Sequence, residues 1–218
     1  MMKLFRLKPI APADPLIPIL FGEWELDLQK KHIPAFVDVR SSGDTTEAVK
    51  ILRSIMNDGD SLHRVFVWHE LKDLGVQPEV ENAKQVLGVV VEVGMRKGTD
   101  YLAAYSDLTA RYYNYTGSKV FLEANIDPVN ESVKDIQNCI EELIDSCRAI
   151  VDNIGLWEGP RRNVPKKGNA RITIITPSGL FFGEGSMAAL ARDSMAAPAM
   201  SHATSLMTKL IDLAKVRQ

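Results

Sequence analysis

The segment that most constrains the fold runs from Val86 to Glu123, because its pattern predicts consecutive antiparallel strands. Its opening run, VLGVVVEV, is rich in β-branched side chains, and a near-continuous apolar run of this kind is typical of a central strand. Glycines and the turn-forming Asp107 divide the remainder into strands at 99–105, 110–115 and 119–123. An antiparallel sheet is therefore the expected centre of the fold.

All five tyrosines of the chain lie in this segment, between positions 101 and 115. Strand alternation places Tyr101 and Tyr105 on one face of their strand, and Leu102 and Ala104 on the other. Tyrosine is common at binding interfaces, where its hydroxyl stays in water, and it is also common in paired strands. Both roles remain open. The interface hypothesis gives these candidate contacts: Tyr101, Tyr105, Arg111, Tyr112, Tyr113 and Tyr115.

Amphipathic helices are predicted on both sides of the sheet segment. Asp44 can cap a helix over 44–57, and another helix is expected over 61–74, although the centre of that stretch is also β-prone. A long helix is predicted from Asp127-Pro128 to Ile154, with apolar residues at alternating spacings of four and three. We favour a helix that lies across the sheet, and an intermolecular coiled coil is the alternative.

A second hairpin is predicted after a basic linker at 155–170. Its strands, 171–176 and 180–183, flank a turn at Pro177-Ser178-Gly179. Ser186 then stands where a helix cap is expected. Pro198 is expected to break the helical region that follows into two parts, because proline disrupts a helix interior.

This order of elements predicts an α+β fold, with an antiparallel sheet of about five to six strands in two hairpin units, covered by helices. In architecture it is similar to the small profilin-like and roadblock folds, which also combine antiparallel hairpins with covering helices. We expect a proline-rich arm at 1–35 and a single domain at 36–218. The apolar residues of the arm favour packing along the domain, and exchange with another subunit is the alternative.

Composition limits the functional classes that the chain can belong to. A formal net charge of −2 supplies no general basic field for binding nucleic acid. Cys139 and Cys147 stand eight positions apart in one predicted helix, about 12 Å along its axis, so both are expected to stay reduced. Reduced cysteines, together with the lack of a secretory or membrane-spanning apolar run, predict a cytoplasmic protein.

No residue pattern reaches the specificity of a catalytic, metal or cofactor motif, so we expect no cofactor and no metal. His69-Glu70 begins like a zinc-protease helix, but Asp73 occupies the position that the second histidine requires. The basic residues between Arg161 and Arg171 are expected to face solvent near acidic helix residues such as Glu141, Glu142 and Asp145. This explanation is favoured over contact with nucleic acid.

Two functions from different classes follow as expectations. The first is a non-enzymatic protein-interaction or regulatory module that binds another protein or a second copy of itself, with no membrane contact. The second is a sensor or enzyme for an anionic small molecule, because a glycine turn into a helix start presents free amides. The residues of that second site would be Gly183, Glu184, Gly185, Ser186 and Arg171.

Overall fold

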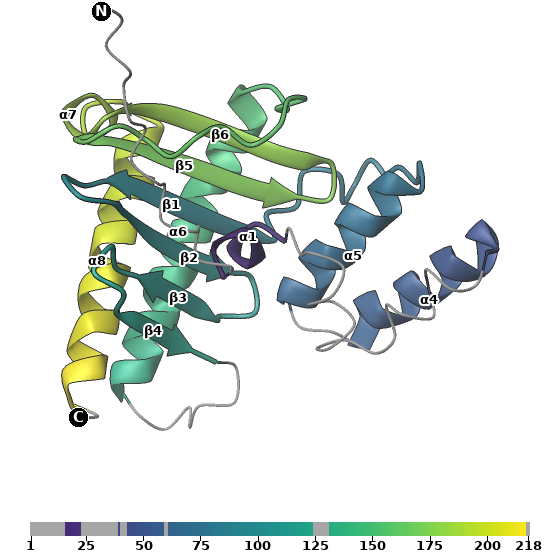
Figure 1. The fold of residues 1–218 in the computed structure, drawn as a ribbon, viewed down its shortest axis with the longest axis horizontal. Helices are drawn as coiled ribbons and strands as arrows, with labels where there is room; N and C mark the ends of the chain where they lie inside the picture. Colours follow the sequence, from purple (N-terminus) through teal and green to yellow (C-terminus); the bar gives the residue numbers. More distant parts are fainter. Residues whose placement is uncertain (1–15, 23–38, 40–42, 59–60, 124–130, 217–218) are drawn as a thin grey trace, which may run out of the picture.

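The computed structural model describes residues 16–22, 39, 43–58, 61–123 and 131–216. A six-stranded antiparallel sheet forms its centre, in the order β4-β3-β2-β1-β5-β6. Helices lie on both faces of this sheet (Figure 1). The predicted α+β fold is therefore confirmed.

The strands form a four-stranded meander, β1 to β4, with a later hairpin, β5–β6, added alongside β1. Placing β1 in the interior of the sheet explains why its sequence is almost wholly apolar. The strand bounds are β1 (Gly88–Gly94), β2 (Thr99–Tyr105), β3 (Ala110–Tyr113), β4 (Lys119–Leu122), β5 (Asn169–Thr176) and β6 (Gly179–Ser186).

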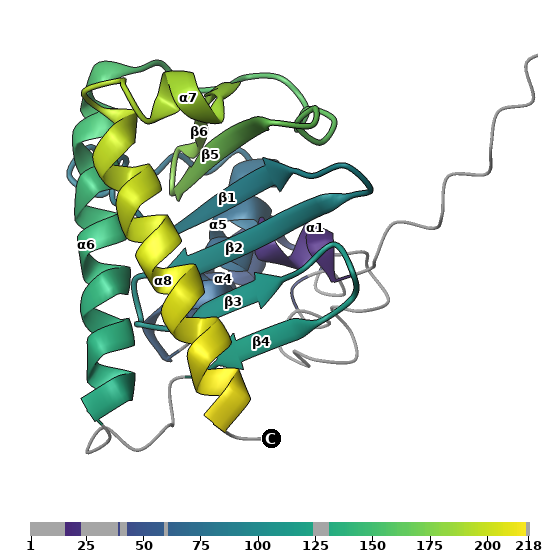
Figure 2. The same ribbon diagram turned by 90° about the vertical axis from the view of Figure 1, so that its left-hand side faces the viewer.

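One face of the sheet is covered by α6 (Glu131–Asn153) and α8 (Ala196–Val216), which pack against each other (Figure 2). The apolar spacing of α6 buries Ile136, Ile140 and Leu143 in a core shared with this sheet face. The long helix therefore lies across the sheet, as favoured, and its apolar stripe is covered within the chain. Its predicted start at 127–128 lies outside the described residues.

The other face packs against α1 (Ile17–Leu20) and α5 (Ser61–Asp73), and α4 (Thr45–Asp58) packs against α5. All three helices share a second core with this face. The helix prediction over 61–74 is confirmed, although its centre is β-prone, because burial of Val65, Phe66 and Val67 outweighs local propensity. Most of the arm at 1–35 lies outside the described residues, so the expected division of the chain stays a prediction.

The ends of three helices test the capping and breaking predictions. Asp44 accepts a hydrogen bond from the Thr46 amide at 2.8 Å, and Ser186 caps α7 (Met187–Leu190). The helical region does fall into two helices, α7 and α8 (Ala196–Val216), but the expected position of the break is wrong, because the helices separate at 191–195 and α8 runs through Pro198. Pro198 occupies the first turn of α8, where its missing amide costs no helical hydrogen bond.

Among the helices of the described ranges, none has the length and apolarity that spanning a membrane requires.

Candidate functional site

The structure places four of the five tyrosines in the interior. Tyr101, Tyr105, Tyr112 and Tyr113 are at most 8% exposed, whereas Tyr115 is 42% exposed. The Tyr105 hydroxyl, for example, donates to the carbonyl oxygen of Leu20 in α1 at 2.8 Å. Most of this cluster therefore joins the sheet to its covering layers, and Tyr115 is its main surface member.

Arg111, the other candidate contact residue, lies half-buried on β3, beside the edge strand β4. Its guanidinium is 5.8 Å from the ring centre of Phe121 and 3.9 Å from the carboxylate of Glu123. Phe121 is 40% exposed, so this corner presents one aromatic ring to solvent. The predicted interaction surface is thus reduced to a small patch on β3 and β4.

One row of residues crosses all six strands on the face that packs against α5. Each member lies opposite the next in the strand register. A lysine at the β4 end is followed by two tyrosines and then by three charged residues. Its members, from β4 to β6, are Lys119, Tyr113, Tyr101, Glu92, Arg171 and Glu184.

Arg171 lies between Glu92 and Glu184 in this row and is only 2% exposed. Its Nε and Nη2 donate to Glu184 Oε2 at 3.0 and 2.9 Å, and its Nη1 donates to Glu92 Oε2 at 3.1 Å. Nη1 also donates to the carbonyl oxygen of Arg162 at 3.1 Å, and Nη2 to that of Asn163. Every guanidinium nitrogen is therefore engaged, so an anion would have to displace an existing partner.

Glu92 is fully buried on β1 and carries the other half of this ion pair. Burial raises the pKa of its carboxyl, and the Arg171 charge opposes that rise. Its Oε1 has no hydrogen-bond partner within the described residues. Arg171 fixes the 162–163 loop to the sheet through its two carbonyl contacts. A buried ion pair of this kind contributes little net unfolding free energy, because the cost of burying both charges offsets their attraction.

The basic loop contacts aromatic rings. Arg161 lies 4.2 Å from the ring centre of Phe21, and Arg162 lies 5.0 and 5.2 Å from those of Trp157 and Phe182. A guanidinium plane stacks well on such rings. The expectation that these arginines face the acidic residues of the long helix is therefore wrong. Asp145 instead pairs with Arg148, and Glu142 with His202.

The segment 183–186 forms the end of β6, and its pairing with β5 continues to Ser186 opposite Asn169. The Ser186 hydroxyl accepts from the Ala189 amide at 3.1 Å, so Ser186 is the helix cap that the sequence predicts. The helix that follows has only four residues. The anionic-ligand hypothesis stays a prediction. Arg171, which it invokes, already donates hydrogen bonds from all three guanidinium nitrogens.

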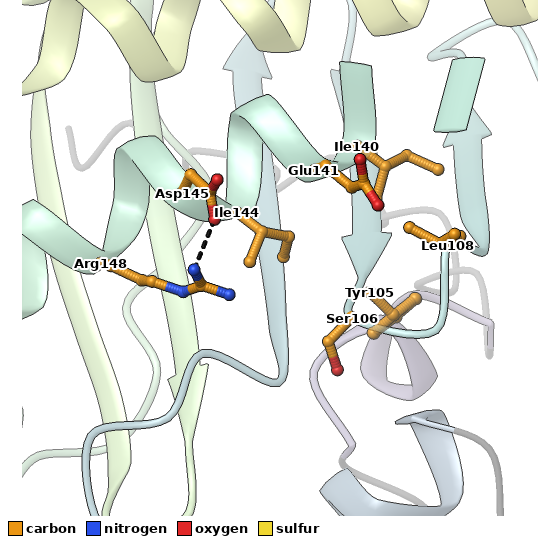
Figure 3. Close-up of a pocket in the computed structure, with 8 residues that line it drawn as sticks. All are labelled: Tyr105, Ser106, Leu108, Ile140, Glu141, Ile144, Asp145 and Arg148. Atoms are coloured by element: carbon orange, nitrogen blue, oxygen red, sulfur yellow. Dashed lines mark ion pairs between the residues drawn. The ribbon is translucent and has the colours of Figure 1, made fainter. Parts of the chain in front are cut away.

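A polar hollow of about 320 Å³ lies between the β2–β3 turn and α6 (Figure 3). Arg148 and Asp145, which line it, form an ion pair with each other at 2.7 Å. Figure 3 also labels Ser106 at the opposite wall, on the turn that follows β2. The charges of Asp145 and Arg148 largely cancel, which leaves Glu141 as a further acidic group of the lining, so this hollow offers no site for an anion.

A second hollow of about 410 Å³ lies on the sheet face that packs against α8, where β1 and β2 approach their shared turn. In Figure 2 the ends of these two strands project beyond α8. We call this hollow the methionine pocket, after its most adaptable lining residues. It is lined by Met95, Met187, Met200 and Met207, by Val91, Val93 and Leu102 of the sheet, and by Gly94, Asp100, Tyr112, Gly168, Ala203 and Thr204.

The mouth of the methionine pocket carries exposed apolar side chains. Met95 and Met187 are 37% and 38% exposed, whereas Met200 at the pocket wall is 7% exposed. Methionine is unbranched and polarisable, so a wall of methionines adapts to the shape of what it contacts. The pocket therefore suits an apolar guest without requiring one fixed outline.

Asp100 is the one charged residue in the lining of the methionine pocket. Its Oδ2 accepts from the Tyr112 hydroxyl at 2.9 Å, and its Oδ1 accepts from the Tyr115 amide at 2.8 Å. Burial and the neighbouring carboxylate raise the pKa of Tyr112 to about 12. Tyr112 therefore remains a neutral donor that holds Asp100 in place.

Sequence reasoning missed this pocket, although part of its signal was visible. Met200, Ala203 and Met207 form one helical stripe, and such stripes are usually covered by core. Here the stripe lines a hollow. Only the arrangement of α8 relative to β1 and β2 shows this, because the other wall of the hollow comes from those strands.

Comparison with known proteins gives no relative: no family model matches the chain, and neither a curated protein nor a solved structure matches it. The profilin-like and roadblock resemblance is therefore not confirmed.

Proposed function

We propose that this chain is a non-enzymatic protein-interaction module that associates with a second copy of itself. The observation that carries the proposal is the methionine pocket, a hollow of about 410 Å³ with an almost wholly apolar lining. Binding sites are commonly concave, mostly apolar and of this size, with a few polar groups that fix orientation. The receiving surface of the module would be this pocket, together with the exposed Tyr115, whose amide donates to Asp100 of the lining.

The physical chemistry of the pocket supports recognition of apolar side chains. Burying one leucine, methionine or phenylalanine side chain contributes about 1.5–3 kcal/mol. The half-exposed methionines at the mouth lose their own contact with water when a partner covers them. Two or three inserted side chains contribute about 3–9 kcal/mol, against a cost of association of about 4–15 kcal/mol, so the contact around the pocket must supply the remainder.

A second copy is the partner that we propose, since symmetric self-association is the commonest form of assembly among soluble proteins. We also propose a cytoplasmic location. Cys139 and Cys147 are buried and unpaired, and burial raises the pKa of the Cys147 thiol to about 12, which makes it unreactive. Buried, reduced thiols are what a reducing compartment permits.

The proposal is tested by closing the pocket with a large side chain from its rim. Thr204 lies at the exposed rim on α8, so Thr204→Trp places an indole over the mouth without forcing it into the core. Thr208 lies one turn further along α8, is also exposed, and does not line the pocket. Both hydroxyls donate to the carbonyl four residues earlier, so Thr208→Trp is a matched control.

Sedimentation velocity over a concentration series is the measurement. We expect the wild type and Thr208→Trp to self-associate alike, and Thr204→Trp to associate at least about tenfold more weakly, a loss of about 1.4 kcal/mol. A wild-type chain that stays monomeric at every concentration, or equal association by both variants, contradicts the proposal.

A further inference from the structure

We infer that the occupant of the methionine pocket is the segment 1–10 of a second copy of this chain, an inference that rests on the proposed function. The segment reads MMKLFRLKPI and precedes the first described residue, Leu16. Its charge, its apolar side chains and its point of attachment each match the pocket.

Charge is the first match. The segment carries Lys3, Arg6 and Lys8 and no acidic residue. The methionine pocket carries Asp100 and no basic residue. Asp100 is 8% exposed and accepts two hydrogen bonds, which leaves acceptor positions on its carboxylate oxygens. A cation brought beside a carboxylate at a partly dry site gains more than the same pair gains in water.

Apolar content is the second match. Six of the ten residues are apolar: Met1, Met2, Leu4, Phe5, Leu7 and Ile10. They alternate with the basic residues closely enough for one extended segment to offer both kinds of side chain to one pocket. Pro9 and the prolines that follow favour an extended backbone, which lowers the entropy lost on docking.

The point of attachment favours a second copy over the same chain. Leu16 leads into α1, which packs on the opposite face of the sheet from the methionine pocket. The five residues between the segment and Leu16 span at most about 18 Å when fully extended. To reach its own pocket, the segment would have to pass round the sheet on this short connection. A segment from a second copy can approach the pocket from solvent, without passing round this sheet.

Charge reversal in the full chain tests the inference. One variant carries Lys3→Glu, Arg6→Glu and Lys8→Glu, and the other carries Asp100→Lys. Each alone is expected to associate at least about tenfold more weakly than the wild type, because like charges then meet in the pocket. An equimolar mixture is expected to regain association, since the intact segment of one variant meets the intact pocket of the other, and the reversed charges also attract.

A second pocket variant guards against a folding defect, because Asp100 also holds Tyr112 and Tyr115. Thr204→Lys adds positive charge at the exposed rim and leaves both hydrogen bonds of Asp100 in place. It is expected to weaken the wild-type association as Asp100→Lys does, and to regain association when mixed with the segment variant. Restored association on mixing requires the segment variant to be folded, and circular dichroism of each pocket variant alone checks that it too is folded.

The outcomes separate this inference from the proposed function. If the segment variant associates as the wild type does while Thr204→Trp does not, the pocket is the interface and the segment is not its occupant. If the variants are weakened but mixing restores nothing, the second-copy segment is overturned. If the wild type is monomeric at every concentration, the inference and the proposed function both fall.

Discussion

Asp100 and Tyr112 act as a pair, because a carboxyl group buried in an apolar pocket needs hydrogen-bond donors. The Tyr112 hydroxyl lies 2.9 Å from Asp100 Oδ2 and accepts in turn from the Asn114 side chain at 3.3 Å. Within the row on the opposite face, Glu92 Oε2 accepts from Arg171 Nη1 at 3.1 Å, and Glu92 Oε1 has no partner among the described residues. Each sheet face thus contains one buried acidic group with an assigned donor.

The pair predicts a specific response to alkaline pH. The folded-state pKa of Tyr112 is raised from 10.0 to about 12, so the neutral phenol is favoured in the folded chain. That stabilisation is complete below pH 10 and is lost as pH rises toward about 12, where the folded phenol ionises. Wild type should therefore lose about 2 kcal/mol more unfolding free energy across this range than Tyr112→Phe does. Denaturant titrations at several pH values measure the difference, and parallel curves for the two chains would refute it.

At the scale of elements, short-range patterns predicted the strands and most of the helices. β2 has the predicted bounds, because strand alternation and a tight turn are both written into its local sequence. β6 extends further than predicted, since pairing with β5 carries the strand through Gly183 and Gly185, which have low strand propensity. The break predicted at Pro198 was misplaced for a similar reason. Whether a proline interrupts a helix depends on where the helix begins, and α8 begins at Ala196, so Pro198 lies in its first turn.

The contact between β1 and the basic loop gives a prediction at this scale. A side chain at Gly94 would overlap the carbonyl oxygens of Pro165 and Lys166, and the Gly168 amide donates to the Gly94 carbonyl at 2.9 Å. Gly94→Ala should therefore displace the loop and cost about 1–3 kcal/mol of unfolding free energy. Gly155→Ala is the control, because no atom lies within 4 Å of the added carbon. Equal stability of the two variants in urea titrations would show that the loop yields without cost.

At the scale of the whole molecule, the sheet separates two cores that differ in what they leave open. The face toward α5 buries Tyr101, Tyr105 and Tyr113, which sequence alone left between a surface and a core role. The face toward α8 ends in the methionine pocket. Its lining comes from positions between 91 and 207, so no local pattern contains it. The fold class was predictable because it depends on local periodicity, whereas this site depends on how far one helix covers one sheet.

The central claim, that the methionine pocket is the site of self-association, is tested most directly by methyl NMR of methionine-labelled full chain over a dilution series. The account predicts that the pocket methyls shift together with concentration, while Met56 and Met195, which lie outside the pocket, do not. The pocket methyls are those of Met95, Met187, Met200 and Met207. A spectrum independent of concentration, or shifts confined to Met56 and Met195, would contradict it.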